Sequence, residues 1–89
     1  MLKIKVGAVY YSVDPIRDLI YVINVLEHRP ASGRVSEYWL ISRKPTNSIM
    51  VTTVGHMLVE TEYFHNQYFI SSDKKETEKK LMLHRLKHG

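Results

Sequence analysis

The stretch Asp18–His28, DLIYVINVLEH, decides the fold of this chain. Seven of its first nine residues are aliphatic or aromatic, and only Asn24 interrupts them before Glu27. A chain of 89 residues can bury such a run on both faces only by wrapping most of the remainder around it, because small domains have little interior. We therefore expect this run at the centre of the core, with Ile20 and Ile23 buried.

Two conformations are open for the run. Asp14 followed by Pro15 is a favourable helix start, and the residues that then fall on one helical stripe are Ile16, Leu19, Ile20, Ile23 and Leu26. The same dipeptide is also a favourable turn. β-Branched and aromatic side chains, which fit pleated sheets better than helices, make up most of the run: Ile20, Tyr21, Val22, Ile23 and Val25. We favour a strand over Leu19–Leu26 with residues 13–17 as its connection; the alternative is a helix from Pro15 to Glu27.

Short strands are predicted on either side of this run. Apolar residues alternate over residues 2–11, which indicates a first strand, and Gly7 permits a bulge or a close approach there. Residues 29–34 (RPASGR) form a loop, residues 35–43 a strand and residues 44–47 (KPTN) a turn. Two further β runs cover residues 49–54 and 57–64, with Gly55 between them. The pattern predicts a meander of antiparallel strands.

The end of the chain has a different pattern. HNQYFISS, residues 65–72, is either a short strand or a helical turn that places Tyr68 and Phe69 against the end of the core. Asp73 and Glu76 match a capping box, and the residues after them favour a helix over about 74–87. Its apolar residues lie in the second half, so we expect the far end to hold the helix: Leu81, Met82, Leu83 and Leu86. The organisation predicted is a small β domain, residues 1–72, with a basic C-terminal helix, residues 73–89, packed on it or extending from it.

Composition limits the class of protein. The chain has no cysteine, which excludes disulfides and thiolate zinc sites and fits a reducing compartment. Neither a signal peptide nor an apolar run long enough to span a membrane is present, so we expect a cytoplasmic protein without a membrane partner. The net charge of +4 is uneven: residues 1–72 carry seven Lys and Arg against six Asp and Glu, and residues 73–89 carry six against three. The basic character therefore belongs to the C-terminal helix.

Residues able to support catalysis or metal binding are present but not arranged for it. His84 and His88 have a ligand spacing on a helix, yet no third ligand accompanies them in the sequence. His56 and His65 flank a predicted strand that carries Glu60 and Glu62, which is also the pattern of a solvated strand face. The seven serines lack a neighbouring His and Asp pattern that would activate a nucleophile. We expect no catalytic residue, no metal and no cofactor.

Binding surfaces are the remaining candidates. Aromatic rings on a sheet beside cations stack bases and hold phosphates in nucleic-acid-binding proteins, although the same rings also fill small cores. The residues predicted for a nucleic-acid interface are Lys74, Lys75, Lys79, Lys80, Arg85, Lys87, Tyr11 and Tyr38. The leading function is therefore a non-enzymatic module that associates with nucleic acid. The alternative is a protein-interaction module, such as a small regulator that docks on a larger complex and exposes an apolar patch.

Two families show similar patterns. The segments GAVYYS, LIYVINV, VSEYWLI, SIMVTTV and LVETEYF resemble the strands of Src-homology-3-like small barrels of the Tudor and KOW kind, which implies a five-stranded barrel. From Asp14 onward the chain also resembles a double-stranded-RNA-binding domain of α-β-β-β-α order. That resemblance implies that Lys74 and Lys75 contact phosphates, although residues 64–70 are then an insertion and Leu81 and Met82 replace small alanines. We favour the barrel.

Overall fold

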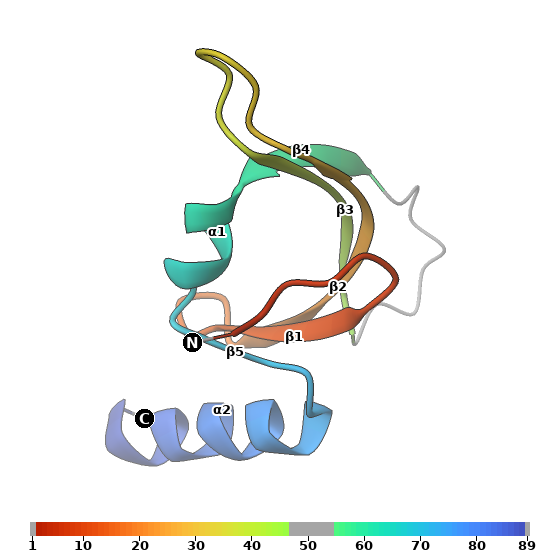
Figure 1. Ribbon diagram of the computed structural model, residues 1–89. Coiled ribbons are helices and arrows are strands. Elements are labelled where there is room, and N and C mark those ends of the chain that lie inside the picture. The colour runs from red at the N-terminus through yellow and green to blue at the C-terminus, as the bar shows by residue number, and fades with distance from the viewer. Residues whose placement is uncertain (1, 47–54, 89) are drawn as a thin grey trace.

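The computed structural model describes residues 2–46 and 55–88 (Figure 1). Five strands form one antiparallel sheet in the order β4-β3-β2-β1-β5, and a C-terminal helix lies beside it. The elements are β1 (Val9–Asp14), β2 (Leu19–Arg29), β3 (Tyr38–Pro45), β4 (His56–Glu60), α1 (Thr61–His65), β5 (Phe69–Ser71) and α2 (Lys74–His88). The prediction of a mainly β, α+β domain with a C-terminal helix is confirmed. Within the described residues, no helix is long and apolar enough to cross a membrane.

The run is a strand from Leu19 to Arg29, so the helical alternative for Pro15–Glu27 is wrong, and with it the α-β-β-β-α order. Strand β2 lies in the middle of the sheet and pairs with β1 on one side and β3 on the other. The Asp14–Pro15 signal serves a turn instead: Asp14 Oδ1 accepts hydrogen bonds from the backbone N–H groups of Ile16 and Arg17, both at 3.1 Å. These are the bonds that a helix N-cap makes as well, which is why the signal was ambiguous.

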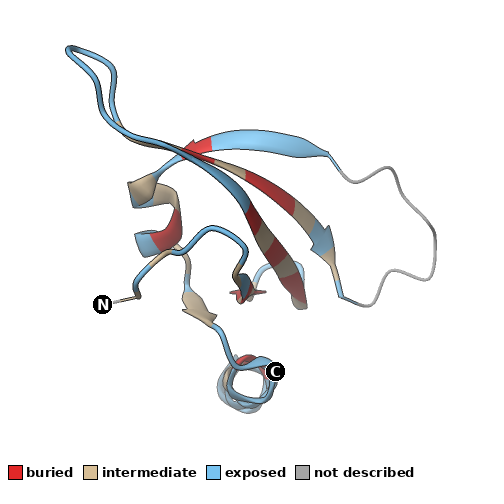
Figure 2. Ribbon diagram, turned by 45° about the vertical axis from the view of Figure 1, so that its right-hand side comes forward, coloured by how far each residue is buried: buried red, intermediate tan, exposed pale blue. Residues whose placement is uncertain are grey.

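The main core lies on the inner side of the bent sheet. Strand pairing places Ile23 opposite Tyr10, Val25 opposite Ile41 and Trp39 opposite Val59. All of these residues are buried, together with Phe64 of α1. Figure 2 shows buried segments on α1 and on the strands around it. A bulge between Val25 and Glu27 of β2 bends the sheet around this cluster. The burial of Ile20 and Ile23 is confirmed. Among the described residues the sheet is not closed, because β4 and β5 are its two edges.

The predicted boundaries need three corrections at the start of the chain and around β3. The first strand begins at Val9, not at residue 2, because Gly7 takes a positive φ of 85° in a turn and breaks the extended run. Val13, predicted to be in a connection, is a buried residue of β1. The third predicted element begins at Tyr38 and continues through Pro45, so Lys44 and Pro45 are in a strand and not in a turn.

The second half of the sheet also departs from the prediction. The β run predicted for residues 49–54 lies outside the described residues. The strand predicted for residues 57–64 ends at Glu60. Residues 61–65 form α1, which places the side chain of Phe64 in the core. Residues 69–71 form β5, which confirms the short-strand alternative, but Tyr68 is exposed and does not close the core. The helix predicted for residues 74–87 is confirmed as α2.

Candidate binding surface on the C-terminal helix

Hydrogen bonds that involve the side chains of Ser71, Asp73 and Glu76 fix the start of α2. Asp73 Oδ1 accepts from the Lys75 N–H at 2.9 Å, as expected of an N-cap residue. The predicted capping box is not completed, because Glu76 accepts a hydrogen bond from the Ser71 hydroxyl at 2.9 Å, and the Asp73 N–H donates to Ser71 Oγ at 3.0 Å. These bonds tie the first turn of α2 to the end of β5 and so fix the direction in which the helix leaves the sheet.

Only a narrow stripe of α2 is buried. Thr77 and Leu81, one helical turn apart, are the buried residues, and Leu81 packs with Val13 and Ile20 on the outer side of the sheet. Figure 2, which looks along the helix, shows burial only on the side that faces the sheet. Of the four apolar residues at the far end, where the helix was expected to be held, Leu81 is buried, whereas Met82, Leu83 and Leu86 remain 58%, 46% and 76% exposed. Along this stripe the helix contacts β1, β5 and β2.

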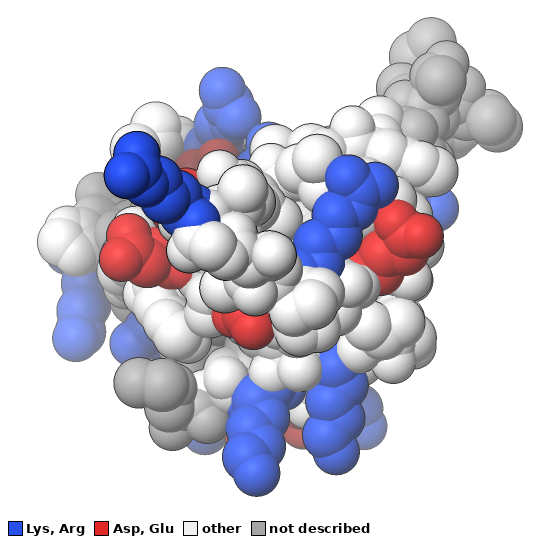
Figure 3. All heavy atoms as spheres, turned by 45° about the horizontal axis from the view of Figure 1, so that its top comes forward, with Lys and Arg blue, Asp and Glu red and all other residues white. Residues whose placement is uncertain are grey.

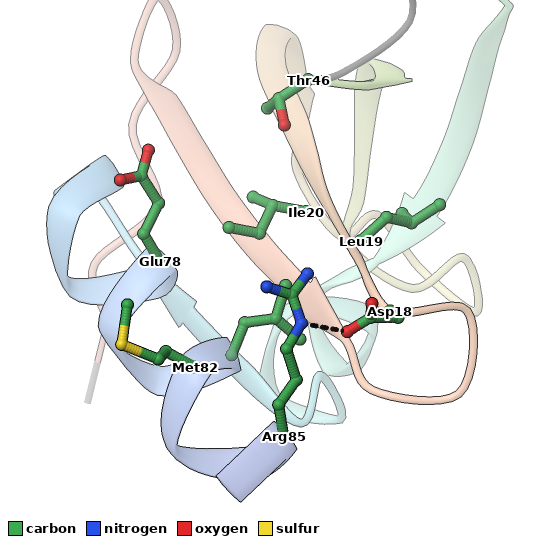
Figure 4. Close-up of a pocket in the computed structure, with 8 residues that line it drawn as sticks. Asp18, Leu19, Ile20, Thr46, Glu78, Met82 and Arg85 are labelled. Atoms are coloured by element: carbon green, nitrogen blue, oxygen red, sulfur yellow. Dashed lines mark hydrogen bonds and ion pairs between the residues drawn. The ribbon is translucent and has the colours of Figure 1, made fainter. Parts of the chain in front are cut away.

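An ion pair adds a second attachment. Arg85 Nε lies 2.6 Å from Asp18 Oδ1, and both side chains are about half exposed (Figure 4). Asp18 ends the β1–β2 turn with a positive φ of 56°, a conformation that Asp tolerates better than most residues. The hydrogen bond with Asp18 raises the pKa of Arg85. Arg85, predicted to contact phosphates, therefore has a carboxylate partner within the protein.

Open hollows lie along α2, and two of them flank its outer side. The hollow drawn in Figure 4 has a volume of about 320 Å³, with the Arg85–Asp18 pair and Glu78 around an apolar floor. It is lined by Asp18, Leu19, Ile20, Thr46, Glu78, Leu81, Met82 and Arg85. The second hollow, of about 340 Å³, is lined by Phe69, Glu76, Lys79, Lys80 and Leu83. Because both hollows open to solvent, the outer side of α2 stands between them as a ridge.

The predicted lysines do not form one flank. Lys74, Lys75, Lys79 and Lys87 are exposed, and Lys75 and Lys79 lie one turn apart. Lys80 is half-buried and turns toward β5, with its Nζ 5.6 Å from the ring centre of Tyr68 and 5.8 Å from that of Phe69. On the face of the molecule in Figure 3, Lys and Arg side chains are interspersed with Asp and Glu side chains. The exposed cations of α2 are thus a local feature of the helix.

The two predicted tyrosines do not join this surface. Tyr11 is half-buried in the cluster beneath α2. Tyr38 begins β3, where its hydroxyl donates a hydrogen bond to Glu60 at 3.2 Å. One ring is partly covered and the other lies beside a carboxylate, so neither offers a flat ring face beside the lysines of α2.

The histidines considered as metal ligands do not form one site: His84 and His88 lie together on α2, whereas His56 and His65 belong to other elements. The His84 and His88 rings lie 4.4 Å apart, and Tyr68 is the neighbour of His84, with its hydroxyl 3.4 Å from His84 Nδ1. His56 begins β4 and His65 ends α1, so the predicted pair is split by two elements. Across residues 2–46 and 55–88, no three His, Asp or Glu side chains are grouped so as to hold a metal ion.

The structure forms a polar cluster around Glu37 that the sequence does not indicate. Glu37 accepts hydrogen bonds from the Thr61 hydroxyl and from His28 Nε2, the latter at 2.8 Å, and the Trp39 Nε1–H donates to Thr61 Oγ1 at 2.9 Å. His28 also stacks on Trp39 with ring centres 4.2 Å apart. The Thr61 and His28 hydrogen bonds hold the pKa of Glu37 below its ordinary value. The pairing of β3 with both β2 and β4 brings these residues together, so no spacing in the sequence points to them.

The exposed ridge of α2, apolar at its C-terminal half and cationic at its N-terminal half, is therefore the strongest candidate for a binding surface among the described residues. The chain matches no family model, no curated protein and no solved structure.

Proposed function

We propose that this protein is a non-enzymatic binding module that docks on a partner protein through the outer side of α2. The observation that carries the proposal is the exposure of Met82, Leu83 and Leu86 on a helix whose single buried leucine is Leu81. Residues three and four apart on a helix are neighbours, so Leu86 lies next to both Met82 and Leu83. The three side chains form one apolar patch, which is the feature that distinguishes a docking module.

The chemistry of the patch indicates the chemistry of the partner. Burial of one large apolar side chain contributes roughly 1.5–3 kcal/mol, so a partner that covers this patch gains enough to offset part of the cost of association. Lys75 and Lys79 continue the ridge toward the start of α2. A helical ridge of this kind fits an apolar groove, and the lysines favour a groove with an acidic rim.

The sheet supplies the rigid base for the ridge, and we propose that it is a partly open small barrel of the Src-homology-3-like kind. Three features support this assignment: the antiparallel order β4-β3-β2-β1-β5, the return of the last strand to pair with the first, and the bend around Phe64. We further propose a cytoplasmic location, in keeping with a chain that contains no cysteine.

A nucleic-acid interface is the second candidate, favoured by the exposure of Lys74, Lys75, Lys79 and Lys87 on one helix. Such an interface would hold phosphates without base stacking, since neither predicted tyrosine accompanies the lysines. Three to five phosphate contacts predict a slope of log affinity against log salt of roughly −3 to −4.5 on a duplex.

Two sets of substitutions separate the candidates. The apolar set is Leu83→Ser with Leu86→Ser, and the charge set is Lys74→Gln, Lys75→Gln, Lys79→Gln and Lys87→Gln. Val35→Ser is the matched control for the apolar set, because Val35 is also largely exposed but lies near the tip of the β2–β3 hairpin. All of these variants should keep the parent melting temperature, since exposed side chains contribute little to stability.

The first measurement is titration against a partner protein purified through its binding to the parent chain. The second is a set of gel shifts on single- and double-stranded DNA and RNA at about 50 and 200 mM salt. Docking through the patch predicts that the apolar set weakens partner binding at least tenfold, roughly the effect of losing 1.4 kcal/mol, whereas Val35→Ser does not. The docking proposal would be overturned, and the second candidate established, by nucleic-acid binding with two properties. Its slope of log affinity against log salt would be steeper in the parent than in the charge-set variant, and its affinity would be unaffected by the apolar set.

A further inference from the structure

The free edge of β4 is a second surface with a defined chemistry. Strand β4 is an end strand of the sheet, and no described residue pairs with its outer edge. Four of its five residues are exposed, among them Met57 and Leu58 at 40% and 48% (Figure 2). Edge strands usually carry a lysine, a proline or a covering segment that prevents pairing with another chain, and HMLVE has neither residue type. The other edge, β5, is three residues long and contacts α2.

The five residues are complementary to themselves in antiparallel register. If Leu58 lies on a two-fold axis, His56 stands opposite Glu60 of the second copy, and Met57 stands opposite Val59 of the second copy. Opposite residues of an antiparallel pair lie close enough for their side chains to interact. The register thus places an imidazole against a carboxylate at both ends of the paired segment and apolar side chains between them.

We propose that two copies of this chain associate through β4, which pairs antiparallel with β4 of the second copy and joins the two sheets. Backbone hydrogen bonds along the edge, the contact of the two Leu58 side chains and the two His56–Glu60 pairs hold the dimer. The partner is a second copy because the strand matches its own reverse in both charge and apolarity. A contact of one five-residue strand on each side is small, so the association is weak and depends on concentration. The inference does not depend on the function proposed for α2.

Cysteine cross-linking tests the register directly, because the chain has no cysteine of its own. On a two-fold axis, two residues at position 58 have Cα atoms about 4.5–5.5 Å apart, which is within disulfide range. Leu58→Cys should therefore form a disulfide dimer under mild oxidation, visible on a non-reducing gel. Leu83→Cys on α2 is the matched control, since Leu83 is 46% exposed and Leu58 is 48% exposed. Preassembly raises the local thiol concentration, so Leu58→Cys should cross-link at least about tenfold faster than Leu83→Cys.

A charge exchange tests the same register without cysteine. His56→Glu places two carboxylates opposite each other at both ends, and Glu60→Lys places a lysine opposite His56. Each single change should weaken dimerisation roughly fivefold in sedimentation equilibrium, because unfavourable cross-strand pairs act twice. The double variant His56→Glu with Glu60→Lys restores opposite charges and should recover most of the parent affinity. Circular dichroism melts verify that each variant stays folded.

The proposal fails under any of three outcomes. A parent chain that remains monomeric up to about 1 mM has no dimer of even the weak, transient class expected here. Equal cross-linking of the Leu58→Cys and Leu83→Cys variants shows that collisions, and not pairing, bring the thiols together. A double variant that dimerises no better than the weaker of the two single variants shows that His56 and Glu60 do not meet.

Discussion

Leu81 is expected to be the main attachment of α2 to the sheet. It is 4% exposed and packs with Val13 and Ile20, whereas the other contributions are the buried Thr77 and the half-exposed Asp18–Arg85 pair. Leu81→Ala removes about three methylene equivalents, or roughly 2.4 kcal/mol at 0.8 kcal/mol each. An exposed ion pair contributes about 0–1 kcal/mol. The substitution therefore removes most of the free energy that docks the helix.

The expected result is local unfolding of α2 with the sheet retained. An isolated helix as short as α2, which has 15 residues, is at most marginally stable in water, so an undocked α2 frays. Hydrogen exchange of its amides should accelerate on the order of 50-fold, which is 2.4 kcal/mol expressed as an equilibrium ratio. Trp39 belongs to the separate core cluster, so its fluorescence melt should move less than the loss of helical circular dichroism.

Leu86→Ala is the matched control, because it is the same change on the same helix at a residue that is 76% exposed. Its effect should stay within about 0.5 kcal/mol, the range for exposed substitutions. Two results would refute the reasoning. Equal effects of the two substitutions would show that the helix faces the sheet with another side, and unchanged exchange in Leu81→Ala would show that other contacts hold it.

Three further predictions concern the sheet. Ile23→Ala should cost about 2–5 kcal/mol in a denaturant melt, because Ile23 is fully buried in the main core, and a loss below about 1 kcal/mol would move the core elsewhere. Asp14→Ala should cost about 1 kcal/mol through the loss of two turn hydrogen bonds, and chemical shifts should show the change confined to residues 14–18. The pKa of Glu37 is lowered in the folded protein, so its contribution to stability is present above the ordinary value of 4.5 and is lost as the pH falls through the lowered pKa. Glu37→Gln should therefore flatten the fall in melting temperature in that acidic window, and an unchanged acid profile would contradict the role of the Thr61 and His28 hydrogen bonds.

Local chemistry determined the elements that depend on neighbours in the chain. The β-branched content of Leu19–Leu26 was enough to favour a strand, and Asp73 with the helix formers after it was enough to place α2. The boundaries were less well determined. Gly7 interrupts the extended run of residues 2–11, because its φ is positive. Residues 61–65 form a helix that places the ring of Phe64 in the core on the inner side of the sheet.

The candidate surface shows the same division. The sequence predicted that the lysines lie in the first turns of α2 and the apolar residues in its second half, because the helical repeat gives the position of each residue along the helix. It could not assign their faces to the sheet or to solvent, since both Leu81 and Leu86 suit a buried stripe; only the packing of Val13 and Ile20 against Leu81 decides between them. Likewise the Arg85–Asp18 pair depends on the docking of α2, the Glu37 cluster on strand register, and the exposure of the outer edge of β4 on strand order, none of which local spacing encodes.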